Sequence, residues 1–156
     1  MNEAITIQKE AALKAHKNAN SKGKTLLENL LGKKLFLKEV TDRIKTVADV
    51  LEDNNITQEQ IDKMFANTPE HFKCQFIAEL LCKSLNEGWT PNWDNSNELK
   101  YYPWFKTGSS GFRLHGYSYW IAGSGVGSRL CFKCRKLAEY AGEQFEYLYK
   151  QFMITQ

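Results

Sequence analysis

The spacing of apolar residues changes at Gly88, and this change limits the chain to a fold that contains both helices and strands. Before Gly88, apolar side chains recur at helical spacing in several segments. After Gly88, aromatic and β-branched residues stand in runs that glycines interrupt, a pattern typical of strands joined by tight turns. The sequence therefore predicts an α+β fold with a helical N-terminal half and a sheet in the C-terminal half.

The strongest helix signal lies directly before Gly88. Thr68 suits an N-cap, Pro69 suits the first turn of a helix, and Gly88 suits its end. The predicted apolar stripe consists of Phe72, Phe76, Ile77, Leu80, Leu81 and Leu85.

Shorter helices are predicted earlier in the chain from residue pairs that form capping boxes. In such a pair, two side chains satisfy free backbone amides at the start of a helix. The pairs are Thr25 with Glu28, Thr46 with Asp49, and Thr57 with Gln60. We expect a first helix over 5–19, a helix from Thr25 to Gly32, and helices over 47–53 and 58–65. The expected core residues of the second helix are Leu26, Leu27, Leu30 and Leu31.

The C-terminal half predicts a three-stranded antiparallel meander packed by a last helix. The strands are expected over 100–106, 112–122 and 128–132, because glycine-rich stretches between them are short enough for hairpin loops. The last helix is expected over 135–152. One of its faces would bury Leu137, Ala141, Phe145, Leu148 and Phe152.

The length of 156 residues is typical of one domain, and we expect a single domain over 1–156. It consists of a basic helical segment (1–38), an acidic helical middle (39–88) and the meander with its helix (89–156). Bases and acids number eight and three over 1–38, five and twelve over 39–99, and eight and three over 100–156. The net charges of +5, −7 and +5 indicate separate surfaces of opposite sign.

The chain carries no run of about 20 apolar residues that would span a membrane. Its first residues also lack the basic-then-apolar order of a secretory signal. We therefore expect a cytoplasmic protein whose four cysteines are reduced thiols.

Four motifs in the C-terminal half together resemble a known family. They are Glu87-Gly88-Trp89 followed by Pro91 and Trp93, then residues 100–105 (KYYPWF), 127–133 (GSRLCFK) and 137–145 (LAEYAGEQF). This combination is similar to a family of uncharacterised proteins encoded by phages and prophages of gut bacteria. The resemblance implies a phage setting, in the cytoplasm of a bacterial host, and it implies nothing about mechanism.

The stretch from Lys100 to Lys136 holds seven bases, nine aromatic residues and no acid. Cations bind phosphates, and flat rings stack on unpaired bases, so the stretch suits an anionic partner, in the first place single-stranded nucleic acid. The alternative is that the aromatic residues are core beneath the last helix and the bases are its solvated rim.

The binding hypothesis assigns roles to six side chains of this stretch. Phosphates would be bound by Lys106, Arg113, Arg129 and Lys133, and bases would stack on Tyr117 and Tyr119. Strict strand alternation predicts that Arg113, His115 and Tyr117 share one face of the sheet.

Catalysis and metal binding have weaker signals. Cys131 and Cys134 with His71 and Cys74 match the residue types of a zinc site. The two later cysteines, however, would lie on a strand and a helix start, not on the tight turn of a zinc ribbon. His115, Asp94 and His71 are the few candidates for acid–base work, and no carboxylates pair in the sheet half. We expect no metal, no cofactor and no enzymatic activity.

The alternative function is protein interaction, in which the acidic middle docks on a host or phage protein, for example to inhibit a defence protein or a host enzyme. A third possibility is self-assembly through the N-terminal helix.

Overall fold

The computed structural model describes residues 6–109 and 111–154. Its chain forms two compact units, Met1–Arg43 and Ile44–Gln156, and each is described by itself. The boundary between the units lies close to residue 38, the predicted end of the basic segment. That the whole chain forms a single domain stays a prediction. No helix of the described ranges is long and apolar enough to cross a membrane.

The first unit consists of short helices. They are α1 (Lys9–Asn18), α2 (Ser21–Leu31), α3 (Lys33–Phe36) and α4 (Val40–Arg43). The ring of His16 stacks on Phe36 at 4.3 Å between centroids, and its Nε2 lies 2.6 Å from Oε1 of Glu28. These contacts of His16 join α1 to α2 and to α3. The first helix is shorter than the predicted range of 5–19, because residues 6–8 and Ala19 are not helical, while Ile5 lies outside the described residues.

The predicted start of the second helix is wrong. α2 begins at Ser21, because the side chain of Asn20 accepts a hydrogen bond from the Gly23 amide at 2.9 Å and caps the helix there. Thr25 therefore lies inside α2, where its hydroxyl donates to the carbonyl of Ser21. Leu26 and Leu30, expected in the core, are 58% and 69% exposed.

In the second unit, local capping predicts two helices well. α5 (Val47–Asp53) and α6 (Gln58–Met64) each begin with a complete capping box. Thr46 with Asp49 starts α5, and Thr57 with Gln60 starts α6, as predicted. These interactions span three residues and need no distant partner.

α7 (Glu70–Asn86) is the long helix of the second unit, and its C-terminal half is deeply buried. Ile77, Leu81 and Leu85 are at most 5% exposed. Phe72, predicted in the same stripe, lies in the first turn of the helix and is 51% exposed, so its prediction as a core residue is wrong. Glu87 in the left-handed region (φ 50°) and Gly88 (φ 88°) end the helix.

The sheet has two strands, β1 (Lys100–Lys106) and β2 (Arg113–Trp120), paired antiparallel. The predicted third strand over 128–132 is wrong. That segment contributes a single bridge, in which Phe132 pairs with Tyr101 through both backbone hydrogen bonds.

Pro103 explains why the third strand stops after one pair. On the side of β1 that meets Phe132, the next hydrogen-bonded pair would need the amide of residue 103. Proline has no N–H, so the ladder loses that bond. The segment before Phe132 therefore runs as bends and turns.

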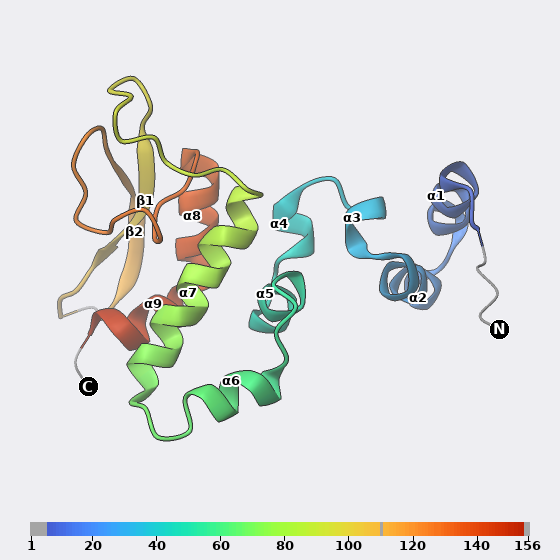
Figure 1. Cartoon of the computed structure of the whole chain (residues 1–156), viewed down its shortest axis with the longest axis horizontal. Helices are drawn as coiled ribbons and strands as arrows, with labels where there is room; N and C mark the ends of the chain where they lie inside the picture. The colour runs from blue at the N-terminus through green and yellow to red at the C-terminus, as the bar shows by residue number, and fades with distance from the viewer. Residues whose placement is uncertain (1–5, 110, 155–156) are drawn as a thin grey trace. The chain divides into compact units, whose positions relative to one another are not determined.

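Two helices, not one, follow the sheet: α8 (Arg135–Gln144) and α9 (Glu146–Met153), separated at Phe145 (φ −118°, ψ 26°). α8 lies against both strands, and α9 lies along α7 (Figure 1). Four of the five residues predicted for the buried face of the last helix are at most 5% exposed. They are Leu137, Ala141, Phe145 and Leu148.

A buried amide joins α7 to the sheet half of this unit. Asn86, which is 5% exposed, donates to the carbonyl of Cys131 at 2.8 Å and accepts from the amide of Lys133 at 2.9 Å. Leaving either backbone group unpaired would cost about 1–3 kcal/mol. Asn86 thus fixes where the chain before α8 lies relative to α7.

Gly142 lets α8 approach the sheet closely. A Cβ atom at this position would lie 2.8 Å from Cβ of Pro103 and would overlap Leu114. We predict that Gly142→Val lowers the free energy of unfolding by about 3 kcal/mol through this overpacking. Urea unfolding followed by circular dichroism measures the change.

The matched control is Gly123→Val, because no atom lies within 4 Å of a Cβ at that glycine. Its unfolding midpoint should stay near that of the wild type. Equal losses in both variants would contradict the close packing of α8 on the sheet.

Candidate nucleic-acid interface

One extra residue in β2 decides how the side chains of the sheet are divided. Trp104 pairs with Gly116, but the next residue, Phe105, pairs with Leu114, so His115 forms a bulge. Residues directly opposite one another share a face, and neighbours along a strand alternate. Trp104 and Gly116 therefore lie on one face, and Phe105 and Leu114 on the other.

We call these faces the tryptophan face and the helix face. The tryptophan face carries the buried Lys100 with Tyr102, Trp104 and Lys106 of β1, and Arg113, Gly116, Ser118 and Trp120 of β2. The helix face carries Tyr101, Pro103 and Phe105 of β1, and Leu114, Tyr117 and Tyr119 of β2. The predicted grouping of Arg113 and Tyr117 on one face is wrong, because the bulge at His115 reverses the alternation between them.

The tryptophan face presents a row of three rings. Tyr102 lies in the middle, with its centroid 6.5 Å from Trp104 and 6.2 Å from Trp120. Tyr102 is only 6% exposed, while Trp104 and Trp120 are 50% and 43% exposed. The buried tyrosine thus supports two indoles that keep much of their surface in solvent.

Two cations extend the row beyond Trp104. Lys106 and Arg113 pair directly opposite one another at the end of the ladder, and both are exposed. Since they share the face of Trp104, the sheet brings two positive charges and two exposed indoles onto one surface. Lys106 and Arg113 are predicted site residues. Trp104 and Trp120 were predicted only as members of the aromatic stretch, since strand alternation alone does not reveal their exposure.

The two predicted stacking residues, Tyr117 and Tyr119, lie on the helix face. Their rings pack on Tyr101, with centroids 5.7 and 6.0 Å away. The guanidinium of Arg135, at the start of α8, lies 4.6 Å from the centre of the Tyr117 ring. Tyr117 is therefore covered by a cation of its own chain, while Tyr119 keeps half of its surface exposed.

The other two predicted phosphate ligands contact groups of α7 and its end. Nζ of Lys133 donates to the carbonyl of Asn86 at 3.2 Å and lies 3.5 Å from the carboxylate of Glu87. Arg129, whose side chain is 80% exposed, lies 3.8 Å from the carboxylate of Glu79. Neither cation belongs to β1 or β2, and each lies near a carboxylate of the chain itself.

Lys100 is a base of the same stretch, but it is fully buried. Its ammonium donates to the carbonyls of Asn95 and Glu98 at 3.2 and 2.7 Å, and it lies 5.3 Å from the ring of Trp93. A hydrogen bond from the amide of Asn92, followed by the contact with Lys100, lowers the pKa of the Glu98 carboxyl. Lys100 thus orders the loop before β1.

The cysteines are not gathered into a metal site. Within residues 6–109 and 111–154, no group of three or more His, Cys, Asp or Glu side chains is placed to hold a metal ion. Burial raises the pKa of the Cys131 thiol to about 11 and also raises the pKa of Cys82. These two thiols are therefore protonated at neutral pH.

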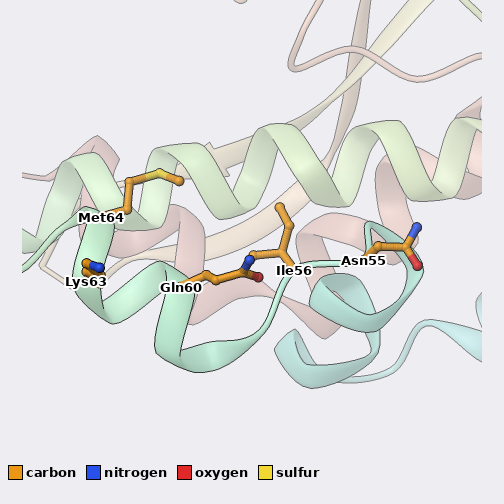
Figure 2. A pocket seen from close by; sticks show the side chains of 5 residues that line it. All are labelled: Asn55, Ile56, Gln60, Lys63 and Met64. Carbon is orange, nitrogen blue, oxygen red and sulfur yellow. The ribbon is translucent and has the colours of Figure 1, made fainter.

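A shallow hollow of about 340 Å³ lies beside α6. Figure 2 shows Gln60 between Met64 on one side and Ile56 and Asn55 on the other, with Lys63 next to Met64. The lining offers apolar surface, two amides and the amine of Lys63, but it holds neither a carboxylate nor a histidine. Such a lining suits contact with an apolar side chain more than acid–base chemistry.

Comparisons with known protein families, with curated proteins and with solved structures find no match. The resemblance to phage-encoded proteins therefore stays a prediction.

The reactivity of the cysteines tests whether Cys131 is buried. We predict that at pH 8 the partly exposed Cys134 reacts with an aromatic disulfide reagent well before Cys131 does. The thiolate is the reactive form, and a pKa raised to about 11 keeps Cys131 protonated at that pH. Peptide mapping by mass spectrometry measures both rates.

Raising the pH toward 11 should speed the labelling of Cys131, because its thiolate fraction increases. Labelling in denaturant, where all thiols are exposed, is the control. If Cys131 and Cys134 react equally fast in the folded protein at pH 8, the burial of Cys131 is contradicted.

Proposed function

We propose that this protein is a non-enzymatic binding protein whose tryptophan face binds single-stranded nucleic acid. The observation that carries the proposal is the presence of two half-exposed indoles and two exposed cations on one face of the sheet. Bases stack on the flat faces of Trp104 and Trp120, and Lys106 and Arg113 bind the backbone phosphates.

The arrangement favours unpaired bases over a duplex. In a duplex the faces of the bases stack on one another, so side chains reach only their edges and the phosphates. The indoles of Trp104 and Trp120 offer ring surface, which is worth about 1–3 kcal/mol for each stacked base. Tyr102 keeps the two indoles apart by its position between them.

Compared with the set expected from the sequence, the proposal keeps Lys106 and Arg113. It exchanges Tyr117 and Tyr119 for Trp104 and Trp120, because the bulge puts the tyrosines on the opposite face from Arg113. Arg129 and Lys133 are left out, since each lies near a carboxylate of the chain itself. Acids are absent from the whole stretch between Lys100 and Lys136, which limits repulsion of phosphates.

The stacking role predicts the effect of removing one indole. Trp104→Ala should raise the Kd for an oligothymidylate or oligouridylate of about twelve nucleotides by about 5- to 150-fold, the equivalent of one stacked base. Fluorescence anisotropy with a labelled oligonucleotide measures the Kd. The matched control is Tyr147→Ala, which removes a 55% exposed ring on α9 and leaves the tryptophan face intact.

The phosphate role predicts a change in salt dependence. In the double variant with Lys106→Ala and Arg113→Ala, the slope of log Kobs against log salt concentration should weaken by about 1.4, because two phosphate contacts are lost. The control is the double variant with Lys63→Ala and Lys150→Ala, which removes two exposed lysines of α6 and α9. An unchanged slope in the first variant would rule out these two residues as phosphate ligands.

Absence of oligonucleotide binding at low ionic strength would overturn the proposal as a whole. The protein-interaction role in a phage setting would then take its place. One observation favours it: the acidic middle contains the hollow beside α6, where Met64 is 57% exposed. An apolar side chain of a partner with basic neighbours fits such a surface.

A further inference from the structure

The outer edge of β2, the edge away from β1, carries backbone groups that point into solvent. The bridge to Phe132 uses both the N–H and the C=O of Tyr101, at 3.0 and 2.7 Å. Both groups of Tyr101 therefore point away from β2. Its partner Tyr119 belongs to a non-hydrogen-bonded pair, in which both residues turn their backbone groups outward. The N–H and C=O of Tyr119 thus point to the outer edge.

The same reasoning applies two residues along the ladder. Pro103 and Tyr117 form the next non-hydrogen-bonded pair, so Tyr117 also turns its N–H and C=O outward. Proline fits at this position of β1 because its missing N–H is not needed for pairing with β2. Tyr117 and Tyr119 therefore each present a backbone N–H and a backbone C=O at the outer edge of β2.

Only one end of this edge is capped. The amide of Leu114 donates to a carboxylate oxygen of Glu146 on α9 at 2.8 Å. For the backbone groups of Tyr117 and Tyr119, no partner at the outer edge is found in the described part of the chain. The open edge thus starts after the bulge and runs to the end of β2.

The open edge also lacks the features that usually block strand addition. Exposed edges are commonly protected by charged side chains, by proline or by covering elements. From Leu114 to Ala122 the sequence has no Lys, Arg, Asp, Glu or Pro. Trp120 and Ile121 at its end are each 43% exposed.

We propose that β2 pairs antiparallel with β2 of a second copy of this chain, with the two-fold axis at Ser118. In this register Tyr117 lies opposite Tyr119 of the second copy, and the outward groups of both form hydrogen-bonded pairs. β2 of each copy thus supplies one of the two paired strands. The result is a continuous four-stranded sheet, which is more stable than two isolated two-stranded sheets.

The side chains of the tryptophan face also fit this register. Trp120 lies opposite Gly116 of the second copy, and no atom lies within 4 Å of a Cβ built on Gly116. A glycine leaves room for the indole of the facing strand, a cross-strand pair that stabilises sheet edges. The open edge from Gly116 to Trp120 has no charged side chain, so no like charges meet along it.

The proposal is tested on the protein alone, so its outcome does not depend on nucleic-acid binding. Sedimentation at increasing concentration should give a wild-type species of twice the 18.0 kDa chain mass. Ser118→Lys and Ser118→Glu should each be monomeric, because like charges would lie directly opposite across the axis. An equimolar mixture of the two variants should recover the dimer, since opposite charges then meet.

The control variants are Ser96→Lys and Ser96→Glu, which place the same charges on an exposed loop residue before β1. Both should dimerise like the wild type. A wild-type chain that stays monomeric up to about 100 μM overturns the proposal, whether or not the variants fold. Dimers that persist in Ser118→Lys and Ser118→Glu, or a mixture that stays monomeric, overturn this register.

Discussion

The pairing of β1 with β2 around the extra residue His115 is the constraint on which the candidate interface depends. Because side chains alternate with a period of two, one inserted residue reverses the face of everything beyond it. Arg113 therefore joins Lys106 and Trp104, and Tyr117 joins the residues beneath α8. The separation of an exposed aromatic and basic face from a helix-covered face follows from this single register shift.

Polar contacts hold several segments of the second unit in place. Asn86 bonds to backbone groups of residues 131 and 133, Tyr140 donates to the carbonyl of Ile44 at 2.6 Å, and Lys100 is bound by two carbonyls of the preceding loop. Buried groups of this kind cost about 1–3 kcal/mol when they lose a partner. Asn86 fixes the segment around Phe132, which bridges to β1, relative to α7, and α8 covers the helix face of the strands.

Pro103 limits the sheet to two strands and leaves the outer edge of β2 open. On one side of β1 the missing N–H stops pairing after Phe132. On the other side the pairing with β2 is complete, which leaves β2 as the strand with unpaired outward groups. The same residue lies under Gly142, so its ring also limits how α8 can pack. One proline thus affects the extent of the sheet, its helix-covered face and the strand that remains open.

The sequence by itself determined the α+β order of elements, the capping boxes at Thr46 and Thr57, the long helix before Gly88 and most of the buried face of the last helix. These features depend on neighbours within one or two helical turns, and such neighbours are visible in the sequence. Tertiary structure alone decided that Leu26, Leu30 and Phe72 are exposed, that the segment before Phe132 is not a strand, and which aromatic rings face solvent. Those outcomes depend on contacts between residues far apart in the chain and on a strand register that a single bulge reverses, so no local pattern contains them.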